Sequence, residues 1–209
     1  EETGREYIEA QSPTAILARG MYPQLWKDPS LQSEDFYSSY FATYIERDVR
    51  QILNIGSLRD FDRFVRACAI RSGQLVNKSE IAKDAGITAV TGNQWLSVLQ
   101  ASNQISLLEP YFSNLSKRLV KSPKLYFNDS GLLCFLLGLS EQGLQSSYHL
   151  GAVWETFVFS ELRKHLLATP QATLWFYRDR KEEVDFLINL EGKLHLLECK
   201  WAEQVDQSA

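Results

Sequence analysis

Two runs of alternating hydrophobic and polar residues, 183–190 and 193–200, flank the dipeptide Glu191-Gly192. Side chains alternate between the two faces of a β-strand, so a period of two is typical of strands. A tight turn between two such runs predicts a β-hairpin. With a two-residue loop, Leu190 faces Lys193, and this register fixes which residues lie opposite each other along the hairpin.

In this register Asp185 lies opposite Glu198, Glu183 lies opposite Lys200, and Asp185, Glu198 and Lys200 emerge on one face. Two carboxylates directly across a strand pair repel at a cost of up to about 1 kcal/mol. A hard cation such as Mg²⁺ between the two carboxylates makes their arrangement favourable instead of repulsive. A nearby lysine can place positive charge beside a phosphoryl anion. The pattern therefore predicts a candidate catalytic site in which Asp185 and Glu198 bind metal. The alternative is a sheet end where the charges simply reach solvent.

Residues 1–56 have the spacing of helices. A short element is expected over 13–20, Pro23 and Pro29 punctuate a loop, and a longer amphipathic helix starts near Ser33. Aromatic residues recur along that helix at helical spacing: Phe36, Tyr40, Phe41 and Tyr44. We interpret this stripe as a packing surface rather than a ligand site.

The next segment predicts a helix over 57–75 followed by two short helices. Asn77 can cap the first of these, Gly86 can end it, and Thr88 can cap the second. Two short helices joined through a glycine predict a helix-turn-helix. Runs 105–112 and 124–127 alternate like the strands of a wing, with 114–121 as the loop between them.

If this winged helix binds DNA, its second helix presents a polar face and its wing presents basic side chains to phosphates. The polar residues are Thr91, Asn93, Gln94 and Ser97. The basic residues are Lys117, Arg118, Lys121 and Lys124. That helix carries no Arg or Lys, which weakens base readout as its purpose. A role as a protein-contact module therefore stays open.

The last region begins with a helix over 151–167, in which Glu155 shares a face with Val158, Phe159 and Leu162. A carboxylate on an apolar face is costly unless it is paired or bound to metal. A strand over 173–178 follows and leads into the hairpin.

Composition changes this picture little. Hydrophobic residues make up 44% of the 209 residues and aromatic residues 12%, which is typical of a folded globular protein. The longest strongly apolar run, 132–139, is too short to span a bilayer, so we expect no membrane segment and a cytoplasmic protein. The three cysteines and three histidines have no zinc-ligand spacing.

The net charge of −4 conceals a segregation of charge. Residues 57–140 carry ten basic and six acidic side chains, residues 1–56 carry five and nine, and residues 141–209 carry seven and eleven. The net basic middle region is a modest indication of a nucleic-acid face there.

Asp185 followed thirteen residues later by Glu-x-Lys resembles the catalytic core of the PD-(D/E)XK nuclease superfamily, the restriction-endonuclease-like fold. Residues 44–49, 71–74 and 117–133 resemble a prokaryotic family in which an AAA-type P-loop ATPase precedes a C-terminal domain of unknown function. That domain holds a winged helix and a PD-(D/E)XK-like region. The resemblance implies that Glu155 is the acidic residue contributed by the first helix of the nuclease fold.

The expected fold class is therefore α+β, in three parts. Residues 1–56 form a helical tail of an ATPase domain, 57–140 a winged-helix domain, and 141–209 a nuclease-like domain truncated at its C-terminal end. The sequence contains no P-loop pattern, so ATP would act only through an upstream domain outside this chain. We expect a fragment of a longer protein.

Three functions follow from these patterns. The first is an Mg²⁺-dependent nuclease whose catalytic residues are Glu155, Asp185, Glu198 and Lys200. The second is a module that binds DNA or protein without cleaving and is coupled to the ATPase. The third is a structural or oligomerising tail, since a sheet that lacks an edge element can pair with another copy of the chain.

Overall fold

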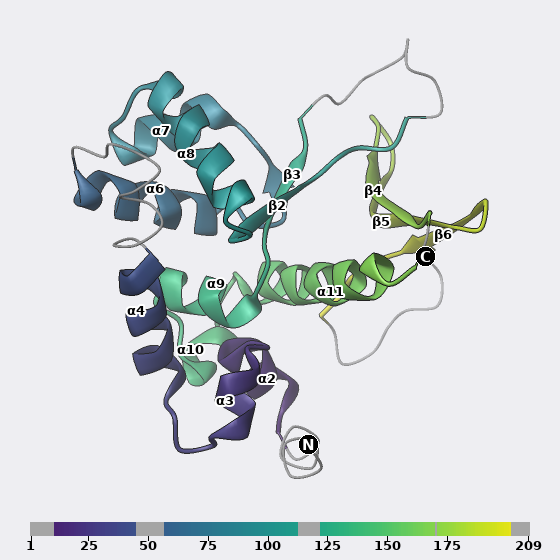
Figure 1. The fold of residues 1–209 in the computed structure, drawn as a ribbon. Helices are drawn as coiled ribbons and strands as arrows, with labels where there is room; N and C mark the ends of the chain where they lie inside the picture. The colour runs from purple at the N-terminus through teal and green to yellow at the C-terminus, as the bar shows by residue number, and fades with distance from the viewer. Residues whose placement is uncertain (1–10, 45–56, 113–121, 170, 202–209) are drawn as a thin grey trace.

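The computed structural model describes residues 11–44, 57–112, 122–169 and 171–201. It combines helices with two small antiparallel sheets, which confirms the α+β class at this level. Figure 1 shows the N-terminal helices at the lower left and the second sheet at the right, with one long helix crossing the centre between them.

Three short helices open the described chain: α2 (Pro13–Arg19), α3 (Pro23–Lys27) and α4 (Ser33–Tyr44). The first two begin with proline, whose fixed φ suits the first turn of a helix. The Ser12 hydroxyl accepts a hydrogen bond from the Ala15 amide and caps α2.

A buried aspartate fastens these helices to α9 (Ser130–Leu137). Asp129 caps α9 by accepting the Leu132 amide at 2.8 Å. It also accepts the Met21 amide at 2.8 Å and the Tyr37 hydroxyl at 2.7 Å. One carboxylate thus joins segments that are far apart in the sequence.

The middle region contains α6 (Leu58–Ala69), α7 (Lys78–Ala85) and α8 (Ala89–Ala101). The predicted helix over 57–75 is too long, because α6 ends at Ala69 and the chain turns at Gly73, which has a φ of +81°. Glycine has no side chain to oppose this left-handed conformation.

The predicted signals around α7 and α8 are confirmed. The Asn77 side chain accepts the Glu80 amide, and the Thr88 hydroxyl accepts the Thr91 amide. Between the two helices, Gly86 adopts a left-handed conformation with a φ of +73° and ends α7.

The first sheet has the order β1 (Gln74–Leu75), β3 (Lys124–Phe127), β2 (Ile105–Leu108). Strand β2 is shorter than the predicted run 105–112. It ends because the following residues leave the first sheet, and the Tyr111 amide donates to the Phe176 carbonyl at 2.7 Å.

The second sheet has the order β4 (Thr173–Arg178), β5 (Glu183–Leu190), β6 (Lys193–Leu197). The hairpin and its register are confirmed, since Leu190 pairs with Lys193. Both turn residues, Glu191 and Gly192, have positive φ, which the tightest hairpin turns require.

A short helix, α10 (Glu141–Gln145), and a long one, α11 (Leu150–Leu167), connect the two sheets. The larger hydrophobic core lies among the helices of residues 11–153. The smaller core lies between the sheets and α11, and its members are Leu108, Tyr126, Phe159, Phe176 and Phe186. Across the described ranges, no helix combines the length and hydrophobicity needed to cross a membrane.

Candidate functional site

The Lys124 ammonium is surrounded by three carboxylates. Its Nζ lies 3.0 Å from Glu183 Oε1, 3.3 Å from Glu155 Oε1 and 3.6 Å from Asp185 Oδ1. The Lys124 side chain is only 3% exposed. We call these four side chains the Lys124 cluster.

The alternation of β3 explains why this lysine is buried. Leu125 and Phe127 point into the larger core, whereas Lys124 and Tyr126 point to the opposite face. On that face the Tyr126 hydroxyl donates to Glu155 Oε1 at 2.5 Å, the same oxygen that lies beside the lysine. One face of β3 thus carries Lys124 and Tyr126, and both contact the Glu155 carboxylate of α11.

Burial and charge oppose each other at these groups. Burial lowers the pKa of Lys124, but the carboxylates of Glu155, Glu183 and Asp185 outweigh it and the pKa is raised overall. Burial raises the pKa of Glu155, and Lys124 and the Tyr126 hydroxyl offset this only in part. The cluster therefore keeps the lysine charged.

The Arg-Ser-Gly-Gln segment, residues 71–74, lies directly under this cluster. The Ser72 and Thr156 hydroxyls share a hydrogen bond of 2.9 Å, and the Gly73 amide donates to the Leu125 carbonyl at 2.7 Å. A side chain at Gly73 would meet Glu155 Oε2 at 3.5 Å, and the positive φ there already disfavours other residues. Residues 71–74 therefore connect α11 to β3 beside the cluster.

An irregularity in the second sheet places Asp185. Trp175 pairs with Leu187 and Tyr177 with Val184, so β5 has one residue more than β4 between these pairs. Such a bulge re-aims side chains. As a result, the neighbours Asp185 and Phe186 both contact groups on the β3 side, one at Lys124 and the other in the smaller core.

The predicted pairs Asp185–Glu198 and Glu183–Lys200 lie beyond the last paired residues, because β6 ends at Leu197. The two hairpin ends still meet, since the Cys199 amide donates to Asp185 Oδ2 at 2.9 Å. Burial and the charge of Asp185 raise the pKa of Glu198, and Lys200 opposes this shift. Asp185 is therefore close to Glu198 as well as to Lys124.

Only two of the four predicted catalytic residues contact Lys124. Glu155 and Asp185 belong to the Lys124 cluster, whereas Glu198 and Lys200 are exposed beside it. Within the described part of the chain, no group of three or more His, Cys, Asp or Glu side chains is arranged to hold a metal ion.

Lys124 itself was predicted to meet phosphates, and its burial among carboxylates shows that prediction to be wrong. Tyr126 and Glu183 were not predicted as site residues. A lysine between Pro123 and Leu125 in an apolar strand was the signal, because a buried ammonium needs counter-charges.

The predicted nucleic-acid face of α8 lies on the surface. Asn93 and Gln94 are exposed and Thr91 is half-buried. Figure 1 places α8 on the left and the second sheet on the right. The predicted wing residues Lys117, Arg118 and Lys121 lie outside the described residues.

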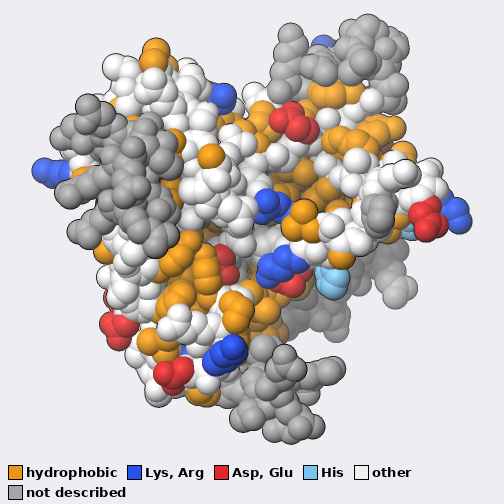
Figure 2. Space-filling view, viewed as in Figure 1, with side chains coloured by type: hydrophobic (Ala, Val, Ile, Leu, Met, Phe, Trp, Pro, Cys, Tyr) orange, Lys and Arg blue, Asp and Glu red, His pale blue; other side chains and the backbone are white. Residues whose placement is uncertain are grey.

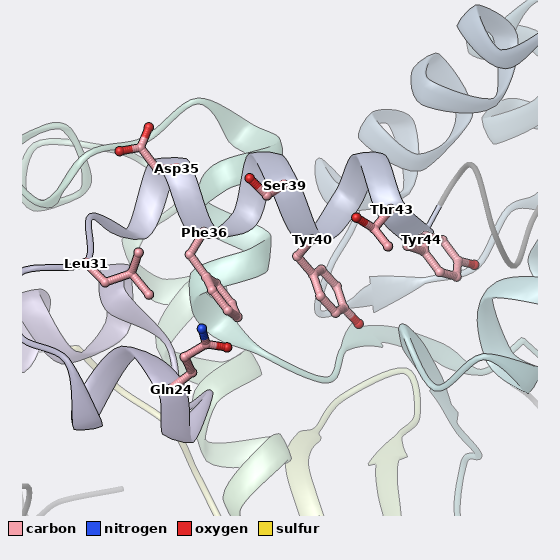
Figure 3. Close-up of a pocket in the computed structure, with 8 residues that line it drawn as sticks. All are labelled: Gln24, Leu31, Asp35, Phe36, Ser39, Tyr40, Thr43 and Tyr44. Carbon is pink, nitrogen blue, oxygen red and sulfur yellow. The ribbon is translucent and has the colours of Figure 1, made fainter.

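A groove of about 540 Å³ runs along one side of α4 (Figure 3). The residues that line it are Gln24, Leu31, Asp35, Phe36, Ser39, Tyr40, Thr43 and Tyr44. None of them was predicted as a site residue. Figure 2 shows basic and acidic side chains scattered among hydrophobic ones, so neither sign dominates the face it draws.

Comparison with known families divides the chain in two. The model described as "Domain of unknown function (DUF8612)" matches residues 11–143. The chain belongs to this family. A second model, "Domain of unknown function (DUF4143)", matches residues 150–209. Lys124 lies in the first region and its three carboxylate partners lie in the second, so the cluster joins the two.

Two curated relatives are each 30% identical over 200 residues. They are "Uncharacterized protein Mb2031c" of Mycobacterium bovis and "Uncharacterized protein Rv2008c" of Mycobacterium tuberculosis. The alignment covers 95% of this chain and 45% of each relative, so the chain spans less than half of their length. No solved structure matches the chain.

Proposed function

We propose that the chain is part of an ATPase-associated protein in which a winged helix contacts DNA and a nuclease-like region carries an Mg²⁺ site. The DUF4143 match supports the first element, because that family is commonly found with AAA ATPases. The order α6, β1, α7, α8, β2, β3 agrees with the order expected of a winged helix and supports the second element. The order α11, β4, β5, β6 agrees with the order expected at the start of a PD-(D/E)XK core and supports the third.

The observation that carries the nuclease-like site is the position of Asp185. Its Oδ1 lies 3.6 Å from Lys124 Nζ, the ammonium that also contacts Glu155, and its Oδ2 accepts the amide of Cys199, the residue next to Glu198, at 2.9 Å. Asp185 thus lies near Glu155 of α11, with which it shares Lys124, and near Glu198 in the segment after β6. Asp185 and Glu198 are the carboxylates of the sequence pattern, and Glu155 is the one that the family resemblance implies.

The donor chemistry fits a hard divalent cation at the Asp185–Glu198 side, because both groups offer carboxylate oxygens and Glu198 is exposed. When bound, Mg²⁺ would stabilise the charge that develops on a phosphoryl group. Asp185 and Glu198 would hold the ion, Glu155 would complete the acidic site, and the exposed Lys200 would orient the attacking water.

A second candidate is a module that binds DNA or protein without cleaving. Lys124 favours it, because this ammonium already offsets part of the negative charge of Glu155, Glu183 and Asp185. An internal cation of this kind can join the two regions without any metal.

Cleavage assays separate the two candidates. Labelled DNA and RNA are incubated with Mg²⁺ or Mn²⁺ and with wild-type or Asp185→Ala protein. The nuclease proposal expects metal-dependent cleavage that Asp185→Ala abolishes while DNA affinity is unchanged. Binding without cleavage by every preparation would favour the second candidate.

The winged-helix proposal is tested by replacing Lys117, Arg118 and Lys121 together with alanine. Each phosphate contact releases counterions, so losing three should weaken DNA binding and flatten its dependence on salt. A triple variant that matches wild type in both respects would instead support a protein-contact role. The ATPase domain and a second copy of the chain are the partners this role would involve.

A further inference from the structure

The Lys124 ammonium donates a hydrogen bond to Glu155 Oε1 at 3.3 Å, and its Nζ also forms ion pairs with Glu183 Oε1 at 3.0 Å and Asp185 Oδ1 at 3.6 Å. The ring of Phe176 lies 5.5 Å from Nζ and covers another side of the ammonium. Lys124 is therefore contacted by side chains from α11, β4 and β5.

We propose that Lys124 is the resident cation of the acidic site, and that a divalent cation engages Asp185 fully only when the Lys124 ammonium is displaced. This inference rests on the proposed metal site. It assigns to Lys124 a positioning role, because the lysine acts on the metal through the carboxylates that both cations need.

The argument is electrostatic. A divalent ion at Asp185 would lie within a few ångströms of Lys124 Nζ, which is itself 3.6 Å from Asp185 Oδ1. Like charges at such a distance repel strongly where water is largely excluded, and the Lys124 side chain is 3% exposed. The two cations therefore compete, and the lysine lowers the affinity of the site for metal.

The competition also connects the two family regions. Lys124 belongs to β3 and to the region of residues 11–143, whereas the carboxylates belong to the region of residues 150–209. The region of residues 11–143 thus supplies the cation that competes for carboxylates of the region of residues 150–209.

Calorimetric titration of Mn²⁺ into the full 209-residue chain tests the inference. Lys124→Met keeps an unbranched side chain that is one heavy atom shorter and removes the charge. Arg178→Met is the matched control, because Arg178 Nη1 lies 3.4 Å from Glu183 Oε2 but is 45% exposed. We expect Lys124→Met to bind Mn²⁺ at least about tenfold more tightly than wild type, and Arg178→Met to change affinity by less than about threefold.

A second pair of variants serves as a control in case Lys124→Met alone does not fold. Glu155→Gln and the double variant Lys124→Met/Glu155→Gln leave Asp185 and Glu198 intact while limiting the unbalanced charge. The double variant should again bind Mn²⁺ more tightly than Glu155→Gln and should gain more thermal stability from added Mn²⁺.

The outcomes separate the two proposals. Equal or weaker Mn²⁺ binding by the Lys124→Met proteins would overturn the role of Lys124 and leave the metal site standing. Absence of Mn²⁺ binding in wild type and in both Lys124→Met proteins would overturn the metal site together with this inference. Binding that appears only after Lys124→Met would support both.

Discussion

Lys124 Nζ on β3 lies 3.3 Å from Glu155 Oε1 on α11. This contact explains how a lysine tolerates burial in an apolar strand and how a carboxylate tolerates the apolar side of a helix. Breaking a buried pair by removing one partner leaves an uncompensated charge, and this typically costs about 3–5 kcal/mol. We therefore expect the junction of the two family regions to depend on both partners of this ion pair.

The Tyr126 hydroxyl is the neutral partner in this junction. Tyr126→Phe removes the donor to Glu155 and keeps the ring, so we expect a loss of about 2 kcal/mol in the free energy of unfolding, since a hydrogen bond to a charged group is worth roughly 1.5–3 kcal/mol. Urea denaturation measures it. Tyr148→Phe is the control because Tyr148 is 90% exposed, and equal stability losses in the two variants would contradict the role of Tyr126.

Asp129 should matter more than an ordinary helix cap. Asp129→Ala removes the cap of α9 and leaves the buried Tyr37 hydroxyl without that acceptor, which together should cost about 3 kcal/mol. Asn77→Ala removes only the exposed cap of α7 and should cost about 1 kcal/mol. Thermal unfolding of both variants checks the difference. A similar shift of the melting temperature in both would contradict the role of Asp129 in holding the N-terminal helices against α9.

The reactivity of Cys199 reports on the surroundings of Asp185 in the wild-type chain. Burial raises the pKa of the half-buried Cys199 to about 12, and Asp185, Glu155 and Glu198 add to this shift. Only the thiolate reacts, so alkylation at pH 8 should be roughly a hundredfold or more slower than in the unfolded chain and should speed up as pH rises. Mass spectrometry locates the label. Labelling of Cys199 at the unfolded rate would mean that the cluster does not enclose it.

The exposed side of β6 is a candidate surface for self-association. Leu196 is 67% exposed and Leu194 is 46% exposed, and among the described strands β6 pairs with β5 alone. Leu196→Lys should lower any concentration-dependent self-association without loss of stability, because charges protect strand edges. Sedimentation velocity of wild type and variant would show it. Identical sedimentation at all concentrations would remove this surface from consideration.

The sequence predicted the elements that depend on local signals. The hairpin followed from alternation and from Gly192, and the ends of α7 followed from Asn77 and Gly86. These residues act on their own turns, so their effect is visible in a single stretch of sequence. The strand β4 and the helix α11 were predictable for the same reason.

The features that the sequence did not predict depend on distant partners. The bulge at Asp185 depends on how β4 pairs with β5, and the burial of Lys124 depends on carboxylates from α11 and β5. The overlong prediction of α6 ignored the pairing of residues 74–75 with β3. Hydrophobic periodicity carries no information on such contacts.

Calorimetric titration of Mg²⁺ and Mn²⁺ tests the acidic metal site most directly. The proteins are wild type, Lys124→Met, Asp185→Ala and, as a control at an exposed carboxylate just before β5, Glu182→Ala. We expect one divalent site in wild type that is strengthened by Lys124→Met, retained in Glu182→Ala and lost in Asp185→Ala. Absence of binding in both wild type and Lys124→Met, or unchanged binding in Asp185→Ala, would contradict the account.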